Sequence, residues 1–261
     1  EIVTKSNFYV KSLNLKIMKS IRIFSTFLLA GLFLGMTSLF ASCNGLYGVH
    51  GDGNVKKEQR TVSSFNGIDV SGAFDIILKQ GVTEEVTVEA DANLLPLIRT
   101  DVVGNTLRIE TKKPVSHVTI MKVYVTVKDL NRIDVSGAVD ITTDGRITVP
   151  ELNIDASGAS DSKLEIAVQK LQLDCSGASK MKFSGSATDV KMDLSGASDI
   201  FGYDMLAETY DLEISGAGNA QINVSKKIRA EISGAGSVKY KGSPSDVDQS
   251  VSGAGSIKKV Q

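Results

Sequence analysis

An acidic residue recurs through most of this 261-residue chain, each time two positions before the serine of a Ser-Gly-Ala tripeptide. In stacked parallel strands these side chains would form one outward file with a spacing of about 4.8 Å. The members of this acidic file are Asp69, Asp134, Asp155, Asp174, Asp193, Glu213 and Glu231. Carboxylate oxygens bind hard divalent cations such as Ca²⁺, so a cation-binding face is one chemistry that the file could support.

The alternative is a solvated face, on which salt and the neighbouring Lys191, Arg132 and Arg229 offset the repulsion between carboxylates. We favour this alternative because Ca²⁺ needs about six or more converging oxygens and a flat ladder offers few. We therefore expect no cofactor, with Ca²⁺ as the less favoured alternative.

Carboxylates in a file could also belong to a polysaccharide lyase or hydrolase, because some β-helices cleave acidic glycans with a carboxylate, calcium and a basic residue. An active site would interrupt one coil, whereas the repeats differ in length by only a few residues. The longest departure is the stretch 201–210, which could form a sugar-contacting edge, although packing is its commoner role. His117 is the only histidine of the predicted folded part. We predict no enzymatic activity and no catalytic residues.

The two cysteines, Cys43 and Cys175, cannot build the disulfide framework of a small secreted domain. Cys175 occupies an apolar position of the repeat and is expected to be a small buried hydrophobe. Cys43 ends the segment Leu39-Phe40-Ala41-Ser42-Cys43, which resembles the lipobox of bacterial lipoproteins, although Phe40 replaces the usual smaller aliphatic residue. The resemblance implies lipidation of Cys43, a membrane anchor, and an outer-membrane lipoprotein of the cell envelope that faces the periplasm or the outside.

The first sixty residues divide by composition. Residues 1–17 begin without methionine and precede an export signal, so we interpret them as upstream translation. Residues 18–42 combine a basic start, an apolar run and small residues, which is typical of a signal peptide; a transmembrane helix is the alternative, but no basic stop-transfer flank follows. Residues 43–60 are rich in glycine and lack periodicity near their start, which predicts a flexible tether with a solvated His50.

The Ser-Gly-Ala tripeptide is the repeat that would position the acidic file. Its serines are separated by 65, 21, 19, 19, 20, 18 and 19 residues, and apolar residues flank each outward acid. A fixed period near twenty with two-residue alternation predicts an all-β parallel solenoid with coils of about 19–21 residues. We expect one domain over residues 61–261. Residues 131–261 should form regular coils, and residues 61–130 should form irregular coils or hairpins that cap one end, the gap of 65 residues corresponding to about three coils.

The glycine of each tripeptide is predicted to make a tight corner, because glycine adopts backbone angles that other residues avoid. These structural glycines are Gly72, Gly137, Gly158, Gly177, Gly196, Gly216, Gly234 and Gly253. The formal net charge of −1, from 29 basic and 30 acidic side chains, gives no electrostatic reason to expect a nucleic-acid partner.

Three features together resemble a bacterial family called putative autotransporter adhesin, head GIN domain. They are the run from Phe65 to Ile76, the segment Asn93-Leu94-Leu95 and the later Ser-Gly-Ala repeats, and the resemblance covers residues 65–256. It implies a right-handed parallel β-helix of the pectate-lyase-like kind, typical of exported lipoproteins in Bacteroidota-like bacteria, with adhesion as its function and no catalytic residues to carry over.

We therefore expect a non-enzymatic, lipid-anchored protein of the cell envelope that binds a polymer, a glycan or a partner protein through one β-helical face. The alternatives are a polysaccharide lyase or hydrolase, and an envelope scaffold that self-associates into a homo-oligomer through its end coils.

Overall fold

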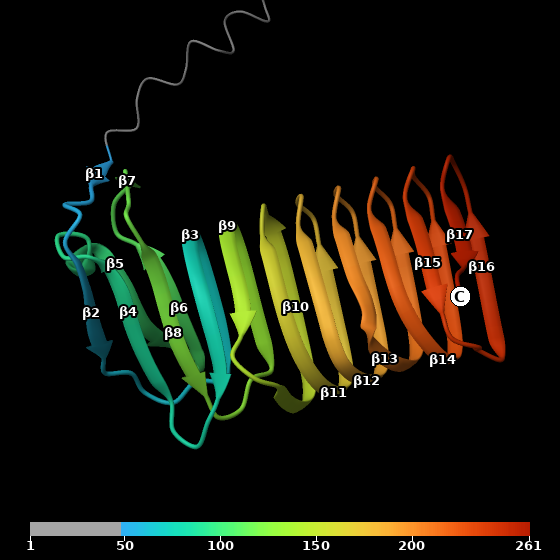
Figure 1. Cartoon of the computed structure of the whole chain (residues 1–261), viewed down its shortest axis with the longest axis horizontal. Coiled ribbons are helices and arrows are strands. Elements are labelled where there is room, and N and C mark those ends of the chain that lie inside the picture. Colours follow the sequence, from blue (N-terminus) through green and yellow to red (C-terminus); the bar gives the residue numbers. More distant parts are fainter. Residues whose placement is uncertain (1–47) are drawn as a thin grey trace, which may run out of the picture. The chain divides into compact units, whose positions relative to one another are not determined.

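Two-residue alternation of apolar and polar side chains gives strands almost throughout the part of the chain that the computed structural model describes, residues 48–261 (Figure 1). Residues 1–47, which hold the predicted upstream segment, signal peptide and Cys43, lie outside the described residues. No helix within residues 48–261 is long and apolar enough to cross a membrane. In chain order the elements are β1 Val49–His50, β2 Val55–Arg60, β3 Gly67–Gln80, β4 Glu85–Asp91, the 3₁₀ helix η1 Leu95–Leu97, β5 Ile98–Val103, β6 Thr106–Thr111, β7 Val115–Ser116, β8 Met121–Val127, β9 Arg132–Thr143, β10 Ile147–Gly158, β11 Asp161–Cys175, β12 Lys180–Leu194, β13 Asp199–Ile214, β14 Asn219–Ile232, β15 Ser237–Lys241, β16 Asp246–Val251 and β17 Ser256–Lys259.

The regular coils run from β9 to β17, and each pairs in parallel with the coil before it. Each coil contributes to two walls. The first half of β14 pairs with β15, whereas its second half pairs with β16. We call these the first and the second wall. The predicted parallel β-solenoid is confirmed, with about seven turns.

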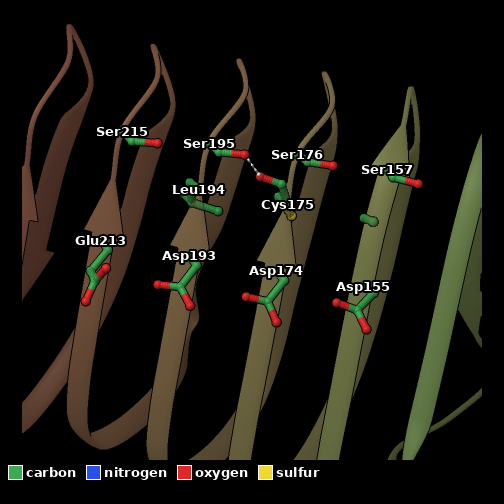
Figure 2. A pocket seen from close by; sticks show the side chains of 11 residues that line it. Asp155, Ser157, Asp174, Cys175, Ser176, Asp193, Leu194, Ser195, Glu213 and Ser215 are labelled. Carbon is green, nitrogen blue, oxygen red and sulfur yellow. Dashed lines mark hydrogen bonds between the residues drawn. The ribbon is translucent and has the colours of Figure 1, made fainter.

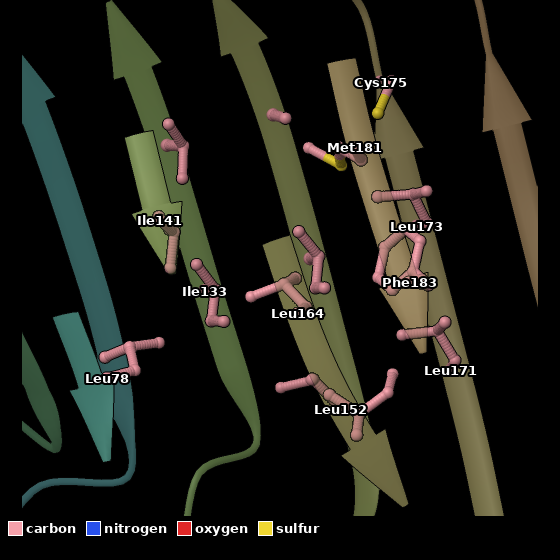
Figure 3. Close-up of a cluster of buried hydrophobic side chains, with 14 of the residues drawn as sticks. Leu78, Ile133, Ile141, Leu152, Leu164, Leu171, Leu173, Cys175, Met181 and Phe183 are labelled. Atoms are coloured by element: carbon pink, nitrogen blue, oxygen red, sulfur yellow. The ribbon is translucent and has the colours of Figure 1, made fainter. Parts of the chain in front are cut away.

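The space between the two walls is filled by apolar side chains, among them Leu164, Leu173 and Phe183 (Figure 3). Cys175 is part of this core, as predicted, and its burial raises the pKa of its thiol to about 12. The same repeat position in β16 holds Val251, which is 45% exposed because β16 pairs only with β14 within the described residues. The core therefore thins at the last coil.

The prediction that the gap between Ser71 and Ser136 holds about three successive coils is wrong. Ser71 in β3 pairs directly with Ser136 in β9. The chain between them folds onto the other side of β3, where β6 and β8 together complete one parallel rung. Beyond that rung β4 and β2 add antiparallel strands, and β5 forms a hairpin with β6. The expected irregular cap with hairpins is present, but it is built outward from β3.

The predicted tether, residues 43–60, is wrong from Gly48 onward, because β2 pairs with β4 and residues 48–54 are held by side chains of the cap. The buried Asp91 accepts hydrogen bonds from the backbone N–H groups of Thr119 at 2.8 Å and Gly53 at 3.1 Å. These bonds, that from Thr119 first, hold the pKa of the carboxyl below its ordinary value. His50, although exposed, packs edge-on against His117 with ring centroids 4.6 Å apart.

The glycines of the repeat are required mainly by close stacking. Positive φ angles occur at Gly72, Gly137 and Gly253 but not at the other five, so the predicted backbone reason is wrong there. A Cβ atom on Gly177 would overlap the carbonyl oxygen of Gly158 in the preceding coil. That same oxygen accepts a hydrogen bond of 2.8 Å from the N–H of Ala178. The side chain must be absent because the backbones of consecutive coils touch at this corner.

This stacking predicts that Gly177→Ala lowers the free energy of unfolding by about 3 kcal/mol, the upper end of what overpacking usually costs. The matched control is Gly145→Ala, at φ +87° with no atom within 4 Å of the added Cβ, which should lose only about 1 kcal/mol from backbone strain. Urea unfolding followed by circular dichroism compares the two. If the Gly177 variant were more stable than the Gly145 variant, backbone conformation, and not the close stacking of the coils, would be the reason that glycine is required.

Candidate functional site

The acidic file lies on the second wall with every member in register. Asp134, Asp155, Asp174, Asp193 and Glu213 occupy paired positions of successive strands. Asp69 extends the file at the β3 end and Glu231 at the β14 end. Figure 2 shows four of these carboxylates on the same side of their strands, below a parallel row of serines. The arrangement predicted from the repeat is therefore present.

A shallow groove of about 350 Å³ runs between the acidic file and the serines of the Ser-Gly-Ala corners. Ala156, Cys175 and Leu194 also line it. Two of these serine hydroxyls donate to the coil before them: Ser157 Oγ to the carbonyl of Val135 at 3.3 Å and Ser195 Oγ to that of Cys175 at 3.4 Å. Carboxylates line one side of the groove and serines line the other, with the apolar side chains between them. The packed coils beneath limit its depth.

Cationic side chains lie within 4 Å of five of the seven carboxylates of the file. Arg132 bridges two coils, with 2.7 Å to Asp134 and 2.7 Å to Asp155. Lys191 lies 3.2 Å from Asp193. Arg108 lies 3.6 Å from Asp69 and Arg229 lies 3.9 Å from Glu231, whereas Asp174 accepts a hydrogen bond of 3.0 Å from the neutral amide of Gln172. These pairs support the interpretation of the file as a charge-compensated surface.

Two electrostatic effects oppose each other at Asp155. Its pKa is raised above the ordinary value, first because burial disfavours the charged form and also because Asp134 and Asp174 lie close. Arg132 acts in the opposite direction. Residues 48–261 hold no group of three or more His, Cys, Asp or Glu side chains arranged for a metal ion. The carboxylates form a flat row beside nitrogen donors, and we propose no cation site there.

The irregular stretch 201–210 lies in β13 and runs from the first wall into the second, since Tyr210 pairs with Ile228. The pairing of β12 with β13 slips between Lys182 and Ser184, and the pairing of β13 with β14 slips between Gly202 and Leu206. The local departure predicted from the sequence is therefore a bulge. Before the bulge, regular alternation leaves Phe201 and Tyr203 half-exposed with the buried Gly202 between them, and the extra residue then leaves Asp204 exposed and Met205 buried. Tyr210, which the sequence grouped with them, is instead buried in the core, and burial raises the pKa of its hydroxyl.

A second cavity opens at this bulge, and we call it the aromatic–lysine cleft. It has a volume of about 530 Å³. It is lined by Asp161, Lys163, Lys180, Lys182, Phe201, Tyr203, Asp204, Gln221 and Lys241. The Nζ atom of Lys180 lies 5.7 Å from the centre of the Phe201 ring, and that of Lys241 lies 4.6 Å from the Tyr203 ring. Lys182 pairs with Asp204 at 3.3 Å.

Sequence reasoning missed the lysines of this cleft. The available signal was the position six residues after each repeat serine, which holds Lys163, Lys182, Phe201 and Gln221 in consecutive coils. Aligning the coils places these four side chains in one file on the first wall. Tyr203 and Lys241 share another repeat position, eight residues after the serine, and the coil between them holds Asn223 there.

Comparisons with known proteins agree with this architecture. A family model described as "Putative auto-transporter adhesin, head GIN domain" matches residues 64–244, well over half of the chain. The chain belongs to this family. The resemblance noted from the sequence is thus confirmed, and membership indicates an extracellular or cell-envelope protein.

Several solved structures share the fold. A "putative adhesin" from Bacteroides fragilis NCTC 9343 is 27% identical with a TM-score of 0.78, and the match covers 82% of this chain and 100% of that one. A "putative adhesin" from Parabacteroides merdae ATCC 43184 and a "putative lipid binding protein" from Parabacteroides distasonis ATCC 8503 are each 22% identical, with TM-scores of 0.65 and 0.66. Each of these two matches covers 82% of this chain and 99% of the other, and shows the fold alone. No match was found among curated proteins.

The bridging role of Arg132 predicts a salt-dependent loss of stability. Arg132→Gln leaves Asp134 and Asp155 without their shared partner, so at low ionic strength it should cost about 0.5–1 kcal/mol. In about 1 M salt the loss should shrink, because screening weakens repulsion along the file. Arg146→Gln is the control, since it removes one exposed pair with Glu165 at 3.1 Å away from the acidic file. Chemical unfolding at both salt concentrations measures the free energy of unfolding of each variant. If salt changed the loss equally in the two variants, the idea that Arg132 compensates the charge of the acidic file would be contradicted.

Proposed function

We propose that this head GIN protein is a non-enzymatic, lipid-anchored protein of the cell envelope that adheres to a polymeric glycan through the outer face of its solenoid. The observation that carries the proposal is the parallel register of the coils, which presents equivalent side chains at equal steps along the second wall and along the first wall outside the bulge in β13. A repeating ligand can contact several coils at once, and weak contacts then add through effective concentration. The "putative adhesin" of Bacteroides fragilis supports the adhesive role.

The chemistry of the described side chains supports binding more than turnover. Carboxylates of the acidic file are mostly bonded to nitrogen donors instead of facing a free proton donor or a nucleophile. Both histidines of the chain, His50 and His117, pack against each other in the N-terminal cap and not beside the acidic groove or the aromatic–lysine cleft. We therefore assign no catalytic residue.

The lipid anchor is the second part of the proposal. If Cys43 carries the lipid, the folded unit begins only five residues later, at Gly48. Five residues span at most about 18 Å, so the N-terminal cap would lie close to the membrane surface. The solenoid itself, and not a long tether, would then carry the binding faces away from the membrane. Self-association through the end coils stays a prediction, favoured by the half-exposed Val247 and Val251 on β16.

Anchoring predicts that Cys43→Ser abolishes incorporation of a labelled fatty acid, because an alcohol cannot form the thioether, and moves the chain out of the membrane fraction. The experiment uses the whole chain in a bacterial host that processes lipoproteins. Cys175→Ala is the matched control, since the thiol of Cys175 is buried and Ala156 fills the same position one coil earlier. Persistent label in the Cys43 variant, or no label in the unchanged protein, would rule the anchor out.

Adhesion predicts that a protein of residues 48–261 binds immobilised glycans with an affinity that rises with polymer length, at least tenfold from a single sugar to a long chain. A glycan array that carries each structure as monomer, oligomer and polymer measures this directly. The monomeric sugars serve as controls within the same array. An array without any signal, together with normal adherence of cells that lack the protein, would count decisively against adhesion.

A further inference from the structure

We propose that the aromatic–lysine cleft binds an acidic glycan, with sugar rings stacked on Phe201 and Tyr203 and carboxylate or sulfate groups held by Lys163 and Lys180. This inference rests on the proposed adhesive function and names the ligand class that one wall would recognise.

Exposed aromatic rings are concentrated at this cleft. Among residues 48–261, only Phe201, Tyr203 and Tyr124 are aromatic side chains of Phe or Tyr that reach the surface, and two of the three lie in the cleft. The others are buried in the core or cap: Phe65, Phe74, Phe183, Tyr210 and Tyr240. Burying a half-exposed aromatic ring against an apolar surface contributes favourably to the free energy of binding. The C–H face of a pyranose is such a surface and can lie flat on the ring.

Unpaired positive charge surrounds the two rings. Four lysines and two aspartates line the cleft, and only Lys182 has a carboxylate within 4 Å, that of Asp204. Within the described residues, Lys163, Lys180 and Lys241 make no ion pair. The acidic file on the second wall shows the contrast, because nitrogen donors there compensate most of the carboxylates. An anionic group that enters the cleft would supply the partner that these ammonium groups lack.

The order of the coils gives the cleft a direction. Lys163 comes from β11, Lys180 from β12, the two rings from β13, and Lys241 from β15. Consecutive strands are about 4.8 Å apart, so the cleft extends over about 19 Å along the solenoid axis. A chain of several sugars laid along that axis would place rings near β13 and anionic groups near β11 and β12. Regular alternation places Phe201 and Tyr203 on the outer face, and the bulge that follows adds Asp204 to that face before Met205 returns to the core.

Cation–π contacts already present do not compete with this use. Lys180 and Lys241 approach the ring edges or faces at 5.7 and 4.6 Å, distances at which the attraction is modest for exposed groups. A carboxylate or sulfate offers each of them a charge-assisted hydrogen bond, which is stronger. Both lysines can therefore turn to a ligand without loss of the fold.

The test measures binding of residues 48–261 to three oligosaccharides of equal length by isothermal titration calorimetry. This unit is suitable because residues 48–261 are compact by themselves. The match to the Bacteroides fragilis structure also covers that protein in full and 82% of this chain. The probes are tetragalacturonate, a sulfated heparin-derived tetrasaccharide and neutral maltotetraose. We expect at least one acidic probe to bind more than tenfold tighter than maltotetraose, and its affinity to fall as salt is raised. The tighter acidic probe identifies carboxylate or sulfate as the recognised group.

Two variants and two matched controls locate the site. Lys163→Gln, at a fully solvated position that the core does not need, and Tyr203→Ala should each weaken the tighter acidic probe about tenfold. The controls are Lys226→Gln, which alters an exposed lysine paired with Glu208, and Tyr124→Ala, which removes the half-buried ring beneath Lys57 in the cap. Both controls should bind like the unchanged protein. Circular dichroism checks that every variant is folded.

The outcomes separate this inference from the proposed function. Acidic probes that bind all four variants equally would overturn the cleft while leaving adhesion through another face intact. Maltotetraose binding as tightly as the acidic probes would overturn the anionic selectivity. An absence of binding to these probes and to every glycan of the array would remove the proposed function together with the cleft.

Discussion

The structure depends on the close approach of backbones at the Ser-Gly-Ala corner. There the N–H of each alanine bonds to the glycine carbonyl of the coil before it, and the glycines stack with no room for a side chain between them. Because the contact recurs at the same residue in every coil, it fixes the register of the whole stack. A slip of one residue would turn the core-facing side chains outward, so the corner also determines which residues lie on each wall.

Most of the solenoid was predictable from the sequence because its constraints are local. The spacing of the serines gave the coil length, and two-residue alternation placed Ile154 inside and Asp155 outside. The cap was less predictable because its pairing is non-local: β6 and β8 complete a rung on the far side of β3. Strand β2 gave no signal, since its residues from Val55 to Gln59 are all exposed and show no buried alternation. The sequence also could not reveal how closely the glycines stack.

The two candidate sites also differ in how far the sequence alone reveals them. The acidic file was conspicuous because it repeats, yet cationic side chains such as Arg132 and Lys191 lie beside most of its members and compensate much of the charge. The aromatic–lysine cleft was not found because the residue type changes from coil to coil at the repeat positions that line it, from Lys163 and Lys182 to Phe201 and Gln221. The bulge in β13 shifts the alternation after Tyr203, so that Tyr203 and Asp204 both lie at the surface while Met205 and Tyr210 lie in the core. Two tyrosines of one stretch thus have opposite roles, and only the register tells them apart.

The two walls show how a uniform scaffold can acquire a selective surface. Hydrogen bonds between coils run the length of the stack, so side chains on either wall are held at fixed spacing before any ligand arrives, and little ordering cost is added on binding. A perfectly regular wall would recognise only a ligand with its own period. The bulge in β13 breaks that uniformity at one place without interrupting the stack, because β13 still pairs with both neighbours on either side of the slip. Selectivity can therefore arise from one irregular coil, while the regular coils around it supply rigidity and additional contacts.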